Sequence, residues 1–275
     1  MIQFIHGAIN MESLLPMLRF MYSFISAVLL LTPVFAAAAD KLTQIPILCY
    51  HNFNPTKPGS MNMRPQTFET QLNWLEANGF TIISLKEAVA YLQGKQELLP
   101  KKSIVLTADD GWKSVYTYML PIIKKHHVPV TLFIYPDTIS KGKNAMTWDE
   151  LKELQKTGLF DIQSHTEGHP NFKQEKKRRS AESYARFVEQ ELVRSKNTLN
   201  EKLGLEVTFL AWPFGIYNDY LEQAAKNAGY TMAFTIDATP ANRDHRPMAQ
   251  PRYMILESQS MKTFQAIANG ANSRG

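Results

Sequence analysis

Residues 103–111 read Ser-Ile-Val-Leu-Thr-Ala-Asp-Asp-Gly, a short apolar run that ends at two carboxylates and a glycine. Its β-branched residues predict a buried strand, and the lysines before it and the glycine after it mark its two ends. Asp109 and Asp110 therefore stand at the carboxyl end of this strand. In barrels of parallel strands, the loops at the carboxyl ends of the strands build the functional site.

Similar strand patterns recur along the chain, and each ends at a polar or unusual residue. They cover 45–50, 160–164, 207–211 and 231–236, and the residues that follow them are His51, His165, Trp212 and Asp237. Helical patterns separate the strands at 66–78, 85–93, 148–157, 180–203 and 219–228. This alternation predicts parallel βαβ units, so we expect an α/β fold in which about seven parallel strands form a closed or nearly closed barrel.

Side chains at these strand ends suit a metal ion. One carboxylate of Asp109 and Asp110, with the imidazoles of His165 and His169, can hold a zinc-like ion and leave one position open for water. The adjacent carboxylate can deprotonate that water. Each motif alone is weak, because Asp-Asp-Gly occurs in many turns and His-x-x-x-His is often two surface histidines. Their shared position at strand ends indicates a metal-assisted hydrolase.

The N-terminus has the pattern of a secretory signal. Arg19 precedes the apolar stretch 20–35, and the alanines at 36–39 offer small residues for cleavage just before Asp40. We therefore expect residues 1–39 to be a signal peptide and residues 40–275 to form one domain that is exported to the periplasm or cell envelope, or secreted. The less favoured alternative is a membrane anchor, since residues 20–39 approach the roughly 20 residues that a spanning helix needs.

Charge and cysteine content limit the other classes. The formal net charge of +5 is modest, and it does not form the dense basic patch that nucleic-acid binding requires. Cys49 is the one cysteine, so no disulfide can form within the chain, and its apolar strand predicts a buried core thiol rather than a nucleophile. We expect a monomer without a nucleic-acid partner.

The motifs together resemble a known family. Thr107-Ala-Asp-Asp-Gly111, Ser164-His-Thr-x-x-His169-Pro170 and Trp212-Pro-Phe-Gly215 are similar, in order and spacing, to the motifs of NodB-type polysaccharide deacetylases, carbohydrate esterase family 4. The resemblance covers residues 45–255. It implies a distorted (β/α) barrel and a divalent metal, Zn²⁺ before Co²⁺ or Ni²⁺. It also implies hydrolysis of N-acetyl groups on an amino-sugar polymer, with Asp109 as general base and Asp110, His165 and His169 as ligands of a metal that binds the attacking water.

The chain departs from the common family pattern at the general acid. Members usually supply it from a C-terminal Leu-x-His motif, whereas this chain has Ile-Leu-Glu-Ser at 255–258. Because the leaving amine must be protonated, another donor is needed. Three candidates remain, namely His245, His51 and Asp109 itself after it has taken the proton from water. We expect Asp109 to return that proton.

A second departure concerns the arginine that braces the catalytic aspartate in many members. It is missing near Ala211, and Arg252 could bring a guanidinium to the same place from another strand, or be an ordinary surface arginine. With Tyr50-His51-Asn52, these departures resemble the branch that deacetylates the biofilm polymer poly-β-1,6-N-acetylglucosamine.

Substrate binding is expected at residues 212–215. Trp212 and Phe214 could stack on a sugar ring, with Pro213 and Gly215 shaping the loop, or the two rings could cap the barrel core. Two alternatives to the predicted activity remain open. The chain could deacetylate peptidoglycan or chitin oligomers, or it could be an inactive carbohydrate-binding relative. A glycosidase is excluded, because the carboxyl groups of adjacent residues cannot flank one bond at the required separation.

Overall fold

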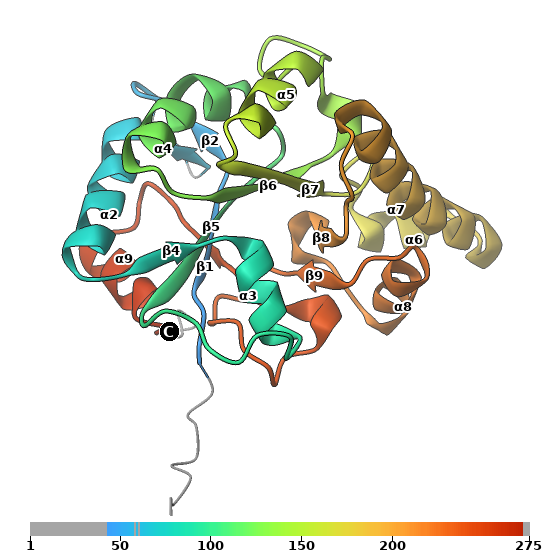
Figure 1. Ribbon diagram of the computed structural model, residues 1–275. Coiled ribbons are helices and arrows are strands. Elements are labelled where there is room, and N and C mark those ends of the chain that lie inside the picture. The colour runs from blue at the N-terminus through green and yellow to red at the C-terminus, as the bar shows by residue number, and fades with distance from the viewer. Residues whose placement is uncertain (1–42, 58, 60, 272–275) are drawn as a thin grey trace, which may run out of the picture. The chain divides into compact units, whose positions relative to one another are not determined.

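A curled sheet of parallel strands forms the centre of the fold (Figure 1). The computed structural model describes residues 43–57, 59 and 61–271, and the predicted signal segment 1–39 lies outside them. Within the described residues, no helix has the length and apolar character needed to cross a membrane.

Seven strands follow one another across the sheet, and every pairing between them is parallel. The predicted barrel-type α/β fold with about seven parallel strands is therefore confirmed. A further strand, β4 (Thr81–Ile83), pairs with β5 outside this path. In spatial order the seven are β10 (Tyr253–Met254), β1 (Ile47–Tyr50), β5 (Ser103–Asp109), β6 (Val130–Ile134), β7 (Phe160–Ser164), β8 (Phe209–Ala211) and β9 (Met232–Phe234).

The two outer strands are joined by the segment that leads into β10. The backbone N–H of Thr235 donates to the carbonyl of Gln250 at 2.8 Å, and that of Ala238 donates to the carbonyl of Arg252 at 3.1 Å. The segment therefore links β9, at one end of the strand order, to β10 at the other end, and β10 pairs in turn with β1. Residues near 250 are thereby brought beside β5, which is far away in sequence.

Helices pack against the curled sheet, most of them on its outer face (Figure 1), whereas the helix at 85–92 packs on the inner face with Val105. A capping box of Thr147 and Glu150 begins one of them, since each side chain accepts a bond from the other's backbone N–H. The helices are α2 (Pro65–Ala77), α3 (Leu85–Leu92), α4 (Leu120–His126), α5 (Trp148–Lys156), α6 (Phe172–Arg178), α7 (Ala181–Leu203), α8 (Asp219–Asn227) and α9 (Met261–Ala268). A short pair, β2 (Asn52–Phe53) and β3 (Asn62–Met63), lies beside the sheet.

Both faces of the sheet are buried, as expected for parallel strands covered by helices. Leu106 of β5 packs in the larger hydrophobic cluster with the covering helices, whereas its neighbour Val105 packs in a smaller cluster on the opposite face. Side chains of a strand alternate between faces, so Thr107 and Asp109 share the face of Val105. This alternation directs the last carboxylate of β5 into the interior of the barrel.

Candidate active site

The two neighbouring aspartates point in different directions because the backbone turns between them. Asp109 ends β5, and Asp110 and Gly111 both adopt left-handed backbone conformations with φ of 79° and 80°. Only glycine fits at position 111, since a Cβ there would lie 2.9 Å from the Cδ1 of Ile139. Asp110 consequently leaves the strand direction and reaches the carboxyl-terminal edge of the sheet.

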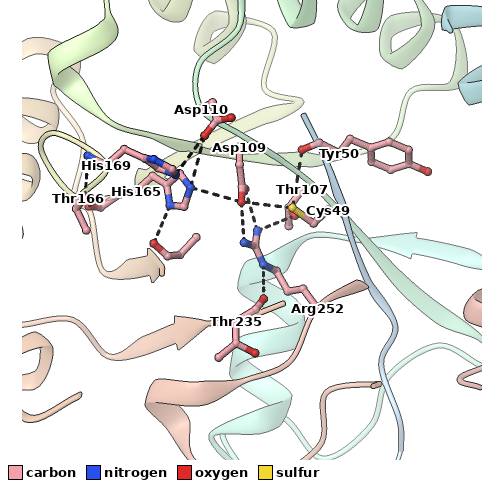
Figure 2. Close-up of polar contacts among 12 residues, drawn as sticks. Cys49, Tyr50, Thr107, Asp109, Asp110, His165, Thr166, His169, Thr235 and Arg252 are labelled. Atoms are coloured by element: carbon pink, nitrogen blue, oxygen red, sulfur yellow. Dashed lines mark hydrogen bonds and ion pairs between the residues drawn. The ribbon is translucent and has the colours of Figure 1, made fainter. Parts of the chain in front are cut away.

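Asp110, His165 and His169 lie together at this edge (Figure 2). The Nε2 atoms of both histidines are 3.6 Å from the Oδ1 of Asp110. One ligand atom from each of the three side chains falls within 4.8 Å of the others, as a cation site requires. The structure thus brings together the three residues that the sequence proposes as ligands.

The protonation pattern of the two histidines suits metal binding. The Nδ1 of His165 lies 2.7 Å from the carbonyl of Ala211, so this nitrogen donates and Nε2 keeps its lone pair for the centre of the cluster. Burial and the neighbouring His165 lower the pKa of His169 to about 4. The ring of His169 is therefore available as a neutral ligand at neutral pH.

One buried oxygen tests whether the cluster fits a cation. Among the side chains that the structure describes, none offers a hydrogen bond to the Oδ1 of Asp110, although this atom is buried. An orphaned buried carboxylate oxygen is costly unless a ligand satisfies it. This oxygen lies 3.6 Å from two imidazole nitrogens and is hydrogen-bonded to neither of them. A divalent cation bound by all three atoms would satisfy it, so the three residues fit such an ion.

The loop that carries His169 is held by helix α7. Thr166 and His169 have left-handed backbones, with φ of 66° and 53°, which costs a non-glycine residue about 1–2 kcal/mol each. The carboxylate of Glu191 accepts from the backbone N–H of Gly168 at 2.8 Å, and its carbonyl accepts from that of Glu167 at 3.0 Å. These bonds offset the strain and keep His169 turned toward Asp110.

Arg252 binds the carboxylate of Asp109 with two hydrogen bonds, of 2.8 Å to Oδ1 and 2.7 Å to Oδ2 (Figure 2). Both side chains are almost fully buried. Burial alone would raise the pKa of Asp109, but the charge of Arg252, with smaller contributions from His165 and from the hydrogen bonds, holds it well below its usual range. The carboxylate is therefore ionised and fixed in orientation.

Cys49 and His51 complete the surroundings of Asp109. The thiol of Cys49 donates to the Oδ2 of Asp109 at 3.3 Å, and burial raises its pKa, so it is a neutral donor within the core. His51 follows β1 directly, and one of its ring nitrogens falls within 4.8 Å of ligand atoms of Cys49 and Asp109. Burial lowers the pKa of His51, against the opposing charges of Asp109 and Asp110.

His245 lies elsewhere. It lines a separate pocket together with Tyr217, Asp237 and Arg246, in the loop between β9 and β10. Among the described contacts, its side chain has none with Asp109 or with the three ligand residues. The geometry therefore brings His51, and not His245, to the candidate centre.

The segment 212–215 is divided between core and rim. Trp212 is 1% exposed and its indole N–H donates to the carbonyl of Met248 at 2.9 Å, so this ring, like the buried Pro213, belongs to the core and cannot stack on a sugar. Phe214 is 56% exposed, has φ of 57°, and lies with its ring centre 4.6 Å from that of His169. Phe214 is thus the aromatic side chain of this segment that faces the candidate site.

Two partners of the site were not predicted from the sequence. The indole N–H of Trp112 donates to the Oδ2 of Asp110 at 3.0 Å, and Glu191 holds the loop of His169. The tryptophan directly follows Asp-Asp-Gly and so could have been noticed. Glu191 lies in the middle of a long amphipathic helix, where no local pattern separates it from solvent-exposed acids.

The chain is similar to known proteins of one family. A family described as polysaccharide deacetylase matches residues 96–233. The poly-beta-1,6-N-acetyl-D-glucosamine N-deacetylase of Staphylococcus epidermidis is 29% identical over 195 residues, which cover 69% of this chain and 66% of that relative. The protein of the same name from Staphylococcus aureus is 28% identical over 194 residues, with the same two coverages of 69% and 66%. The chain thus spans just under two thirds of the length of both relatives.

Solved structures share the fold. A Streptococcus pyogenes deacetylase, PplD, in complex with acetate has 26% sequence identity and a TM-score of 0.73, over 82% of this chain and 99% of that chain. IcaB from Ammonifex degensii has 23% identity and a TM-score of 0.70, over 82% and 96% of the two chains. With the family match extending over half of its sequence, the chain belongs to the polysaccharide deacetylase family.

Proposed function

We propose that this protein removes N-acetyl groups from an N-acetylglucosamine polymer of the poly-β-1,6-linked type, with the help of a divalent cation. The observation that carries the proposal is the ionised carboxylate of Asp109, gripped by Arg252 and set beside the Asp110, His165 and His169 cluster. Family membership supports the reaction, and the names of the staphylococcal relatives support the polymer.

The reaction needs a Lewis acid, a base and a proton donor. When bound by Asp110, His165 and His169, a divalent cation, Zn²⁺ before Co²⁺ or Ni²⁺, supplies the Lewis acid that polarises the acetamide carbonyl and activates water. Asp109 takes a proton from water as the water oxygen adds to the carbonyl carbon. Arg252 keeps Asp109 ionised and oriented, which readies it for this transfer. The carbon–nitrogen bond then breaks, the amine nitrogen gains a proton and acetate leaves.

His51 is our candidate for the donor of that last proton. Its ring lies beside Asp109, whereas His245 lines a different pocket. Because Arg252 holds the pKa of Asp109 low, the proton that Asp109 takes from water passes to His51 in our proposal, and the imidazolium of His51 then protonates the amine nitrogen. This departs from the expectation based on the sequence, in which Asp109 served both steps.

The exposed ring of Phe214 beside His169 offers an apolar face on which a sugar ring can stack. We propose that it holds the sugar whose acetyl group reacts. The polymer is the partner that this site calls for, and the predicted export of the chain would bring the enzyme to polymers of the cell envelope. The monomer expected from the sequence stays part of the proposal.

An inactive carbohydrate-binding relative is the less favoured candidate. Its main support was the missing C-terminal histidine, and His51 supplies an imidazole beside Asp109 from another strand. A binding module also gains nothing from the buried Oδ1 of Asp110, which has no hydrogen-bond partner among the described residues, because leaving such an atom unsatisfied lowers stability. The whole set is simpler to explain as catalytic machinery.

The test is acetate release from poly-β-1,6-N-acetylglucosamine, chitin oligomers and peptidoglycan, with and without a chelator. We expect release from the first polymer, loss of release with the chelator, and recovery with Zn²⁺, Co²⁺ or Ni²⁺. Release from another polymer only would correct the substrate. Release that persists without any bound metal would refute the role of the cation.

Two variants separate the residue roles in this assay. Asp109→Asn should keep bound metal and lose turnover by about 10²–10⁴-fold, the usual contribution of a general base. Asp110→Ala should lose both metal and turnover. Asp149→Asn, on the exposed first turn of α5, is the matched control and should keep both. Full turnover in Asp109→Asn would refute the assignment of the base.

A further inference from the structure

The two carboxylate oxygens of Asp110 have different surroundings. Oδ2 accepts a hydrogen bond of 3.0 Å from the indole N–H of Trp112. Oδ1 is buried, has no hydrogen-bond partner among the described residues, and lies 3.6 Å from the Nε2 atoms of both His165 and His169. The carboxylate is thus divided into one oxygen that is satisfied by the protein and one that is left for a ligand.

Trp112 is itself held on both sides by a neighbouring segment. It forms an isolated antiparallel bridge with Ala145, and its ring packs against the main hydrophobic cluster. Next to it, the N–H of Lys113 donates to the carbonyl of Asn144 at 2.7 Å, and the N–H of Met146 donates to that of Gly111 at 3.0 Å. These contacts fix the backbone before and after Trp112, so its indole has a defined position beside Asp110.

We propose that Trp112 is a positioning residue that makes Asp110 a ligand through Oδ1 alone. Occupation of Oδ2 by the indole N–H keeps the carboxylate from rotating to present both oxygens to the cation. A coordination position then stays open for water and substrate, which a catalytic metal site needs. This inference rests on the proposed metal centre and deepens it.

Indole is well suited to this task. Its N–H only donates, so it cannot compete with Asp110 for the cation, and its rigid ring loses little entropy on fixing the bond. Hydrogen-bond partners of metal ligands typically change metal affinity by about 10–100-fold when they are removed. Trp112→Phe deletes this donor, keeps an aromatic ring in the same space and changes no charge.

The experiment compares Trp112→Phe with the wild type and with Trp148→Phe in the full chain. Trp148, at the start of α5, packs against the same hydrophobic cluster as Trp112 but makes no described contact with Asp110, His165 or His169, so it controls for loss of an indole. Zn²⁺ affinity is measured by competition with a chromophoric chelator, and the visible spectrum of bound Co²⁺ reports the number of ligands. We expect about 10–100-fold weaker Zn²⁺ binding in Trp112→Phe. We also expect a weaker Co²⁺ absorption as the coordination number rises, and neither change in Trp148→Phe.

The possible results separate the proposed metal centre from the role of Trp112. Absence of metal binding by the wild type would refute the proposed centre itself. Tight metal binding by the wild type, with equal affinity and an unchanged Co²⁺ spectrum in Trp112→Phe, would refute only the role of Trp112. Thermal unfolding of the metal-free variants separates both from a general loss of stability, because a purely structural role would lower the melting temperature without altering the Co²⁺ spectrum.

A second measurement does not require Trp112→Phe to fold. In the ¹⁵N-labelled wild type, one indole N–H resonance should shift when Zn²⁺ is added, and one should also shift in Asp110→Ala, because the acceptor of Trp112 has changed. If no indole resonance responds to either change, Trp112 does not donate to Asp110 in solution and the proposal fails.

Discussion

Arg252 and Asp109 are 143 residues apart in the sequence, yet the guanidinium of one meets both carboxylate oxygens of the other inside the barrel. The same guanidinium also donates to the hydroxyl of Thr107 at 3.1 Å and to the carbonyl of Thr235 at 3.1 Å. The pair therefore joins β5 to the segment between β9 and β10 at the point where the outer strands meet.

Removing Arg252 should lower both stability and activity. Arg252→Met leaves the charge of Asp109 buried without a partner, which should cost about 3–5 kcal/mol in the free energy of unfolding. Adding Asp109→Asn removes that charge, so the double variant should be more stable than Arg252→Met alone. Urea unfolding of the two single variants and the double variant measures the coupling, and strictly additive losses would contradict a direct ion pair.

The proton donor can be identified from a pair of histidine variants. His51→Gln should reduce the turnover number by about 10²-fold or more, because it removes the imidazole beside the base. His245→Gln should retain turnover close to that of the wild type, since His245 lines another pocket. Acetate release at saturating polymer is the measurement, and metal content is checked in both variants. The opposite ranking would transfer the role to His245, and two fully active variants would return it to Asp109.

Phe214 should act on substrate binding rather than on turnover. Phe214→Ala removes an apolar face beside His169, so we expect a higher KM and a turnover number within a few-fold of the wild type. Tyr118→Ala changes an exposed aromatic residue on the π-helical turn Val115–Met119 and serves as the control. A fall in turnover number with an unchanged KM would place Phe214 in the chemical step instead.

Gly215 should be more sensitive to substitution than another glycine of similar backbone conformation. Its φ is 64°, and a Cβ would lie 2.5 Å from the Cγ1 of Ile236, whereas Gly158 has φ of 72° and no atom within 4 Å of such a Cβ. Gly158→Ala should cost only the backbone strain, about 1–2 kcal/mol. Gly215→Ala adds the clash and should cost clearly more. Equal losses in thermal unfolding would mean that Ile236 can move aside.

Local sequence patterns predicted the strands that carry the site. The strand at 160–164 is found as β7 with the same ends, and the strand at 103–108 extends by one residue to Asp109. The predicted strand at 207–211 is shorter, because the N–H of Val207 donates to the side chain of Asn200 and that of Thr208 donates to the side chain of Gln163. Side chains from other elements took these two backbone groups away from the sheet.

The sequence alone could not predict where Arg252, His51 and Trp212 lie. Arg252 reaches Asp109 because β10 and β5 both pair with β1. The order of strands in a sheet is not a local property of sequence. His51 is brought to the site by the same neighbouring strands. For Trp212, a ring at a strand end can turn inward or outward, and the acceptor that draws it inward is the carbonyl of Met248, 36 residues later.

The buried thiol of Cys49 can report how often the barrel opens. Cys49 is the one cysteine of the sequence, and it is 0% exposed where β1 runs beside β5. A thiol reagent can reach it only when the structure opens around β1, so the rate of its modification under native conditions reports the free energy of that local opening. An adduct there would occupy the space next to Asp109. Modification of the transiently open state would therefore also be seen as a loss of the intact site.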